Sequence, residues 1–128
     1  MTSSSLILAL LVGLAGACGA VARYTLGRSI AERYGSQFPW GTLLINVTGA
    51  FLIGLVFACA GHHFISTMFQ TVLATGFLGG YTTFSTMTWE GVQLARGGST
   101  RSSIRYFGSN LVLGLLAAAL GLALGGWL

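Results

Sequence analysis

The sequence predicts an all-α integral membrane protein with four transmembrane helices in one domain. Of its 128 residues, 54% are hydrophobic and only 6% are charged, whereas a soluble domain carries roughly a quarter charged residues. The net charge of +4 comes from arginines that separate apolar runs, which does not favour nucleic-acid binding. Four charge-free runs each exceed the roughly 20 residues that cross about 30 Å of hydrocarbon. They are Thr2–Ala22, Tyr34–Gly61, Phe64–Trp89 and Tyr106–Leu128.

The first two helices are predicted at residues 4–26 and 40–61, with a connection over Gly27–Pro39 between them. Pro39 and Trp40 mark the start of the second helix, because proline suits a first helical turn and tryptophan suits the membrane interface. A short connection then holds two histidines, which are expected to be an interfacial pair, with a proton or metal role as the alternative. They are His62 and His63.

The third helix is predicted at residues 65–95, with a break near 79–83. The stretch Phe64–Ala95 has 32 residues, and as one continuous helix it would extend about 48 Å, beyond the hydrocarbon core. The sequence GGYTT fits a break, since glycine tolerates the required dihedral angles. Irregular backbone at membrane depth is tolerated only where protein buries it or it lines a cavity, and its free carbonyls can bind a small cation. A helix merely kinked for packing is the alternative.

The fourth helix is predicted at residues 104–127, after the basic turn ARGGSTRSS at residues 95–103. With four crossings, the first and third connections share one side of the membrane, and all six arginines lie on or near that side. The positive-inside rule then places these connections in the cytoplasm and both termini outside. The chain is therefore expected to be a multi-pass protein of the cell (inner) membrane.

Small residues form a stripe on the predicted first and fourth helices. Such stripes let helices approach closely in a membrane. Packing within the chain and contact with a second subunit both remain open, and the thinness of a four-helix bundle favours an oligomer. On the fourth helix the stripe is Gly114, Ala118, Gly121 and Gly125, and on the first it is Gly13, Gly16 or Ala17, and Ala20.

Polar side chains recur one helical turn apart within the predicted spans. The second helix carries Thr42 and Asn46, and the fourth carries Tyr106 and Asn110. An asparagine amide has two N–H donors and no net charge, so a line of such groups can replace water around an anion without trapping it. Hydroxyls also crowd the third segment, at Thr82, Thr83, Ser85 and Thr86.

Phe84 and Met87 flank these hydroxyls at i, i+3 spacing. They are either packing residues or, in the case of Phe84, an aromatic edge with partial positive charge that faces an anion. Glu90 is the only acid in or near a predicted span, and it lies near the end of its segment. No pair of carboxylates or Ser/His/Asp set is present, so an enzyme is not expected. Proton-coupled transport normally uses a carboxylate deep within a span, which makes Glu90 a weak candidate.

Three stretches together resemble the Fluc/CrcB family of fluoride channels: GACGAVARY, WGTLLINVTGA and GFLGGYTTFSTMTWE. The resemblance implies small four-helix subunits, with the third helix broken at mid-membrane, that pair as a dual-topology antiparallel dimer with two pores. It also implies passive and highly selective export of cytoplasmic fluoride, which protects the cell from fluoride toxicity. The lipid bilayer and a second subunit would then be the partners, with no nucleic acid involved.

The resemblance also assigns roles to particular residues. Arg23 and Glu90 would lie at a vestibule, and Phe84 would be the first of two phenylalanines, the Phe box, whose ring edges face the ions. The backbone carbonyls of Gly79 and Thr82 from both subunits would bind a structural Na⁺ at the dimer interface, with no organic cofactor. The implied pore and polar track comprises Thr42, Asn46, Thr83, Phe84, Ser85, Thr86, Met87, Tyr106 and Asn110.

Two features depart from the family pattern. Met87 occupies the second Phe-box position, where only its methyl could face an anion, so conduction is expected to persist with altered rate or affinity. The one-sided arginines favour a single orientation, whereas an antiparallel homodimer needs the same chain to insert both ways. A homodimer is favoured, and a heterodimer with an oppositely biased paralogue is the alternative.

Two other functions compete with a fluoride channel. A small dual-topology multidrug or cation exporter would need a membrane-embedded glutamate in its first helix, and this first span has no acid. A non-conducting membrane assembly subunit would explain the small-residue stripes but not the paired polar residues at 42–46 and 106–110.

Overall fold

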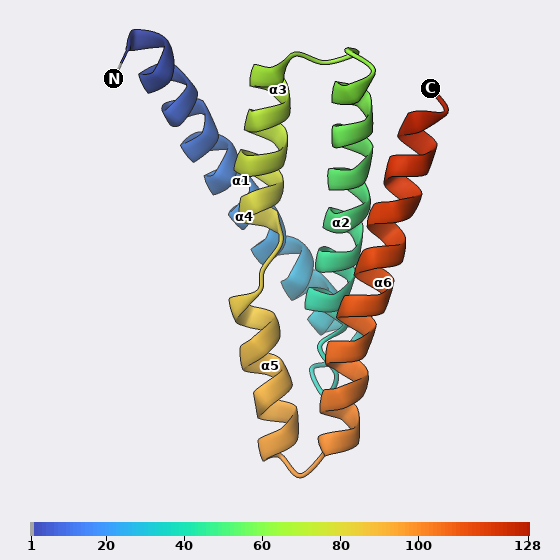
Figure 1. The fold of residues 1–128 in the computed structure, drawn as a ribbon. Coiled ribbons are helices and arrows are strands. Elements are labelled where there is room, and N and C mark those ends of the chain that lie inside the picture. Colours follow the sequence, from blue (N-terminus) through green and yellow to red (C-terminus); the bar gives the residue numbers. More distant parts are fainter. Residues whose placement is uncertain (1) are drawn as a thin grey trace.

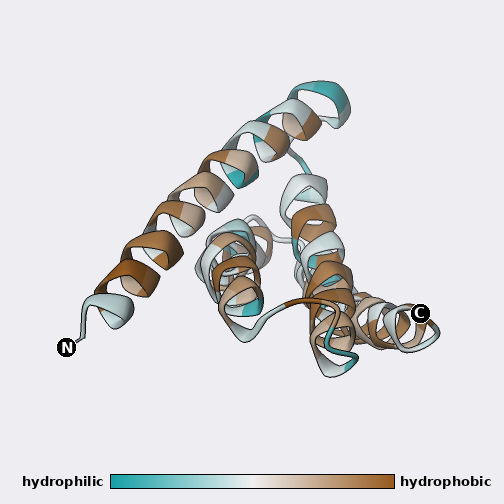
Figure 2. Ribbon diagram, turned by 90° about the horizontal axis from the view of Figure 1, so that it is seen from above, coloured by the Kyte–Doolittle hydropathy of each residue, from teal (hydrophilic) through white to brown (hydrophobic). Residues whose placement is uncertain are grey.

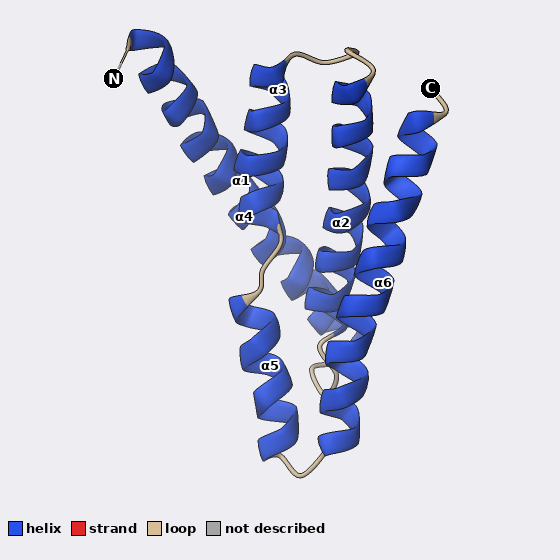
Figure 3. Cartoon of the chain, viewed as in Figure 1, coloured by secondary structure: helices blue, strands red, loops and turns tan. Residues whose placement is uncertain are grey.

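The computed structural model describes residues 2–128, which form helices and no strand. Three helices are long and apolar enough to cross a membrane, so the protein is a multi-pass membrane protein: they are α1, α2 and α6. Between α2 and α6, the chain is divided into shorter helical pieces (Figure 3). The elements are α1 (Ser3–Tyr34), α2 (Trp40–Gly61), α3 (Thr67–Thr71), the π-helical η1 (Val72–Leu78), α4 (Gly79–Tyr81), α5 (Ser85–Arg96) and α6 (Thr100–Gly126).

The elements form an elongated bundle (Figure 1). Both termini and the α2–α3 connection lie at one end, and the α1–α2 and α5–α6 connections lie at the other, as the sequence predicts. Seen from above, α1 diverges from the other helices towards its N-terminus, and apolar residues predominate along it except at its two ends (Figure 2). The arginine-bearing segments therefore share one end of the bundle.

Helix α1 is longer than predicted, because the expected connection from Gly27 is helical up to Tyr34. An ion pair of 2.9 Å between Arg28 Nε and Glu32 Oε1, one turn apart, supports this extension. The helix ends at Gly35, whose φ of 84° favours glycine. The first connection is thus only residues 35–39, and α2 begins at Trp40 as predicted.

Glycines let the backbones of α2 and α6 come into direct contact. A side chain at Gly54 would meet the backbone of Ala118 and Leu122, and one at Gly121 would meet the backbone of Phe51. A side chain at Gly125 would meet the Cβ of Ala58 and the backbone of Leu55. Most of the small-residue stripe on α6 therefore packs within the chain, although Gly114 has no atom within 4 Å of its Cβ position.

Gly16 of the predicted stripe on α1 packs against the third segment together with Gly19, which the stripe does not include, whereas nothing lies within 4 Å of a Cβ at Gly13. A side chain at Gly19 would meet the backbone of Phe77 and Tyr81, and one at Gly80 would meet the backbone of Gly16. The buried core of Ile45, Leu78 and Tyr81 lies where α2 meets η1 and α4. Glycine contacts with α1 and apolar contacts with α2 thus fix the position of α4.

The third segment leaves helical geometry at Thr82, whose φ and ψ are −78° and 158°, and α5 begins at Ser85. The expectation that glycine dihedrals cause the interruption is wrong, because Gly79 is helical, with φ −62° and ψ −37°. Gly80 also lies within the helical α4, where it allows the close approach of α1. The π-helical η1, which the sequence analysis does not anticipate, precedes this interruption.

Candidate functional site

The Asn46 side chain holds the interruption between α4 and α5. Its Oδ1 accepts a hydrogen bond from the Thr83 backbone N–H at 2.9 Å, and its Nδ2 donates to the Thr83 carbonyl at 3.0 Å. Because a backbone N–H can only donate and a carbonyl can only accept, these partners fix the orientation of the amide. One carboxamide of α2 therefore occupies both backbone groups of Thr83.

Asn46 also connects the interruption to α6. Its Nδ2 donates a second hydrogen bond to Asn110 Oδ1 at 3.1 Å, and Asn110 Nδ2 donates to the carbonyl of Tyr106 at 2.9 Å. An asparagine amide has only two N–H groups, so both donors of Asn46 are occupied. In this conformation Asn46 cannot donate to an anion without losing one of these bonds.

The Thr83 hydroxyl forms the next contact along the chain. Its Oγ1 accepts from the Thr86 backbone N–H at 3.1 Å, which caps the first turn of α5, and lies 3.4 Å from Ser85 Oγ. Thr83 is buried. Its main chain and side chain are thus both engaged, by Asn46 and by α5.

The backbone N–H groups of Thr83 and Thr86 both bond to side chains. Two backbone carbonyls are therefore left without their usual helical partners. In a continuous helix, each N–H bonds the carbonyl four residues earlier. The Thr83 N–H would then bond Gly79, and the Thr86 N–H would bond Thr82, but they bond Asn46 and the Thr83 hydroxyl instead. The unpaired carbonyls belong to the two residues for which the sequence resemblance implies a Na⁺ site.

Neutral oxygens suit a small monovalent cation, since unwound backbone carbonyls coordinate Na⁺ in membrane proteins. Gly79 is exposed on the surface of the single chain. Within residues 2–128, no group of three or more His, Cys, Asp or Glu side chains gathers that could hold a metal. The donors present thus fit a carbonyl-bound cation.

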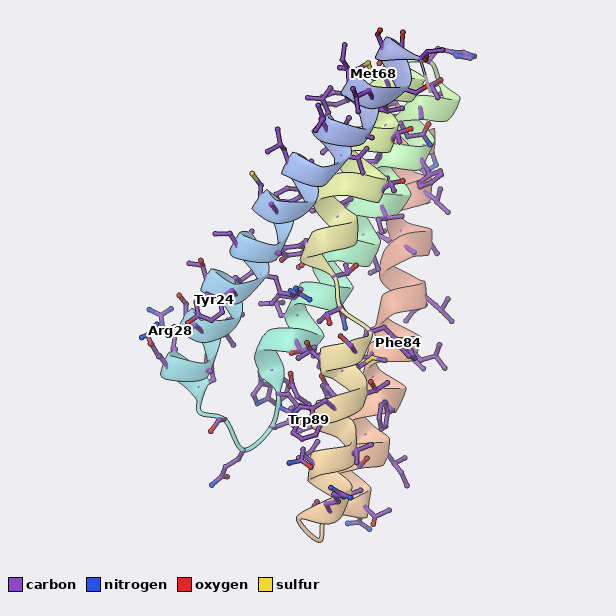
Figure 4. The ribbon with its side chains drawn as sticks, turned by 90° about the vertical axis from the view of Figure 1, so that its left-hand side faces the viewer. Tyr24, Arg28, Met68, Phe84 and Trp89 are labelled. Carbon is purple, nitrogen blue, oxygen red and sulfur yellow. The ribbon has the colours of Figure 1, made fainter. Side chains whose placement is uncertain are left out.

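A groove of about 300 Å³ opens beside the interruption. Phe84 and Met87 both line it, so the structure brings together the two side chains at the predicted Phe-box positions. Phe84 is 76% exposed and lies beside the unwound stretch (Figure 4). The lining residues are Asn46, Ala50, Ile53, Thr82, Thr83, Phe84 and Met87.

A second polar cluster lies nearer the arginine-rich end. Thr42 Oγ1 donates to Glu90 Oε1 at 2.7 Å, and both residues line a second groove of about 260 Å³. Tyr106 is fully buried beside Thr42, Glu90 and Asn110, but its hydroxyl has no hydrogen-bond partner within the described part of the chain. Among the described residues, it is a buried side-chain polar atom that no hydrogen bond satisfies, although three polar side chains lie beside it.

The predicted site residues fall into these two clusters, with one exception. Asn46, Thr83 and Asn110 are joined by hydrogen bonds, and so are Thr42 and Glu90. Arg23 is partly buried on α1 and forms no ion pair with an acid of residues 2–128. The roles of all these residues in ion passage stay predictions.

Sequence reasoning missed three residues that support the second cluster. Phe38 packs edge-on against the Tyr106 ring, with 5.6 Å between centroids. The buried Ser103 donates to the Gly91 carbonyl at 2.7 Å, which ties α6 to α5. In the sequence, only position could have indicated two of these residues: Ser103 lies one turn before Tyr106, and Gly91 directly follows Glu90.

The fold and site define a multi-pass membrane protein in which polar side chains from α2 and α6 converge on an interrupted helical segment. A family model described as "CrcB-like protein, Camphor Resistance (CrcB)" matches residues 10–122. The chain belongs to this CrcB family.

Curated relatives match most of the chain. One from Acidobacterium capsulatum is 49% identical over 115 residues, which are 89% of this chain and 92% of that protein. One from Rhizobium meliloti is 45% identical over 90% of this chain and 93% of its own length, and one from Thermus thermophilus is 44% identical over 91% and 92%. All three are named "Fluoride-specific ion channel FluC".

Proposed function

We propose that this protein is a subunit of a fluoride-selective channel that lets the ion leave the cytoplasm passively, down its electrochemical gradient. Membership of the CrcB family and the names of the curated relatives support the substrate. The observation that carries the proposal is the unpaired hydroxyl of the buried Tyr106 beside the amide network of Asn46 and Asn110. Neutral donors can replace water around a small anion and still release it.

The exposed surface at the interruption supports a dimer. The single chain exposes Gly79, Phe84 and Ser85 around an unwound stretch of backbone. Lipid cannot satisfy such backbone, so within a membrane it must be covered by protein or line a cavity. The proposal is that residues 67–96 make the fourth crossing, interrupted at mid-membrane, and that a second subunit covers this face.

The proposed dimer is antiparallel, so that each chain takes one of two opposite orientations and the pair has two pores. A homodimer is the simpler arrangement, and a heterodimer with an oppositely biased paralogue is its alternative. In either, the carbonyls of Gly79 and Thr82 from both subunits would bind one structural Na⁺. The capture of the N–H groups that normally pair with these carbonyls supports this site.

Reconstitution tests the channel directly. The protein, purified from its single gene, would be placed in liposomes loaded with fluoride, and efflux would be followed with a fluoride electrode beside a chloride control. Rapid efflux of fluoride alone is expected, and it would also establish that no separate subunit is required. If this chain alone gives no fluoride efflux, but efflux appears when a paralogue with the opposite arginine bias is co-expressed, the heterodimer would be favoured. Silence in both preparations would contradict the proposal.

A substitution separates a channel from a non-conducting assembly subunit. Phe84→Ala removes an exposed ring that lines the groove, so it should slow fluoride efflux in protein that size-exclusion chromatography shows to be dimeric. Asn46 is unsuitable for this comparison, because its removal also releases the backbone of Thr83. Unchanged efflux from the Phe84 variant would argue against this groove as the fluoride path.

A further inference from the structure

We propose that Asn46 is a positioning residue of the cation site, because its carboxamide holds the Thr83 N–H away from the Gly79 carbonyl. The inference rests on the proposed Na⁺ site and goes beyond it, since it assigns to a side chain of α2 the task of keeping a ligand of the third segment available. Asn46 itself does not contact the cation. It acts through the backbone of Thr83.

Asn46 Oδ1 and the Gly79 carbonyl compete for one hydrogen, that of the Thr83 N–H. Thr83 is buried, and an unpaired buried N–H is costly. The acceptor within its own segment that helical geometry offers is the Gly79 carbonyl, four residues earlier. In the structure, Asn46 Oδ1 accepts this hydrogen bond, with 2.9 Å between it and the Thr83 nitrogen. Without Asn46, α4 can extend by one residue, and the Gly79 carbonyl then accepts the Thr83 N–H within the helix.

Asn46 binds the Thr83 backbone at two points. Its Nδ2 binds the Thr83 carbonyl at 3.0 Å while its Oδ1 binds the N–H. Two bonds to one residue resist the rotation that would return the N–H to a helical direction. The bond from Nδ2 to Asn110 then fixes the amide against α6.

Asn46 cannot bind fluoride while it makes these hydrogen bonds. Both of its N–H groups are occupied, by Thr83 and by Asn110. A direct fluoride ligand would need one of them free. The bonding in the structure therefore assigns Asn46 to the geometry of the interruption, and leaves anion binding to donors such as the Tyr106 hydroxyl.

The experiment measures Na⁺ binding apart from ion flux. Thermal unfolding of the detergent-purified protein, followed by tryptophan fluorescence, would be recorded in NaCl and in N-methylglucamine chloride at equal ionic strength. The Na⁺ concentration that gives half of the stabilisation is the readout. Asn46→Ala should raise this concentration by about tenfold or more, which corresponds to roughly 1.4 kcal/mol of binding energy.

A matched control lies on the same helix. Thr48 also contacts α4 by a side-chain hydrogen bond, 3.0 Å from the Tyr81 hydroxyl, but it does not touch the Thr83 backbone. Thr48→Val should leave the half-stabilising Na⁺ concentration within about twofold of wild type, a change of roughly 0.4 kcal/mol. Equal Na⁺ affinity in wild type and Asn46→Ala, or an equal loss in both variants, would overturn the inference.

A conservative variant keeps the test decisive if the alanine variant fails to fold. Asn46→Asp retains an oxygen that can accept the Thr83 N–H and loses the donors to Thr83 and Asn110. If the acceptor is what protects the Gly79 carbonyl, the Na⁺ affinity of this variant should stay within about threefold of wild type, or roughly 0.7 kcal/mol. A loss of tenfold or more in Asn46→Asp would contradict the proposed role.

Parallel flux measurements separate this inference from the proposed function. If wild-type protein conducts fluoride but its stability does not respond to Na⁺, the inference fails and the channel stands. If Na⁺ stabilises wild type and the Asn46 variants respond as expected, but no fluoride efflux occurs, the inference stands and the channel proposal fails.

Discussion

Replacing Gly80 by alanine tests whether the backbone of α4 must lie in direct contact with the backbone of α1. A Cβ at this position would lie 2.9 Å from the carbonyl carbon of Gly16 and 3.0 Å from its Cα, and closer still to its carbonyl oxygen. Ordinary contact begins at 3.4 Å, so the two helices must separate by more than 0.5 Å, the difference between 3.4 and 2.9 Å. No side-chain rotation relieves the clash, because the obstructing atoms belong to the backbone.

Overpacking of a well-packed site costs about 1–3 kcal/mol. Because the backbone of Gly16 cannot yield locally, we expect the free energy of unfolding of Gly80→Ala to fall by about 2–3 kcal/mol. The measurement is unfolding in detergent followed by tryptophan fluorescence and circular dichroism. Fluoride efflux should fall as well, since α4 leads directly into the interruption at Thr82.

The control for this substitution is Gly13→Ala, on the same face of α1. Nothing lies within 4 Å of a Cβ at Gly13, so alanine should be neutral or stabilise the helix by about 0.5–1 kcal/mol. If Gly80→Ala were as stable as wild type, or behaved like the Gly13 variant, the described packing of α4 against α1 would be wrong.

Three further substitutions test the two polar clusters. Met87→Phe adds a second aromatic edge to the groove, so the rate or apparent affinity of fluoride efflux should change, and identical values for both would exclude a role for Met87 there. Thr42→Val strands the half-buried Glu90 carboxyl and should lower the free energy of unfolding by about 1–3 kcal/mol, whereas Thr42→Ser should not. Ser103→Ala removes the second bond to the Gly91 carbonyl and should lower the free energy of unfolding by about 0.5–1.5 kcal/mol in the same assay, and wild-type stability would contradict that bond.

Local sequence rules predicted those features of the fold that are determined locally. Pro39 and Trp40 marked the beginning of α2, because proline and tryptophan have positional preferences that no tertiary contact needs to supply. The end of α1 was placed too early, since a charged helix can continue beyond the apolar run that predicts a membrane span. Its true end depends on Gly35, whose positive φ was not recognised as a stop.

The interruption shows where local rules fail. The glycines of GGYTT were an obvious cause from dihedral preference alone, yet Gly79 and Gly80 are helical. The observed cause is the capture of two N–H groups, one of them by a side chain 37 residues earlier in the chain. A hydrogen-bond partner so far away in sequence leaves no periodic signal around Thr83, so only the three-dimensional structure could identify it.

The site followed the same division. Helical spacing grouped Asn46 with Thr42 and Asn110 with Tyr106. In the structure, however, Asn46 bonds Asn110 and Thr42 bonds Glu90, and spacing could not say which donors were already occupied. The structure separates Asn46, which has no free N–H, from Tyr106, whose hydroxyl has no partner in residues 2–128. That distinction changes the expected chemistry of each residue, because an anion can be bound only by a donor that is not already engaged.

Thr83 is the residue on which the proposed anion and cation sites both depend. Its backbone is held by Asn46, which leaves the Gly79 carbonyl unpaired, and its hydroxyl caps α5, which sets where the helix after Phe84 begins. Phe84 is then left 76% exposed on a single chain. The unwound backbone beside that ring is unfavourable in lipid but can be covered at an interface with protein. The proposed dimer and the proposed cation site therefore depend on the same hydrogen bonds. A variant that removes the cation site should also weaken the dimer.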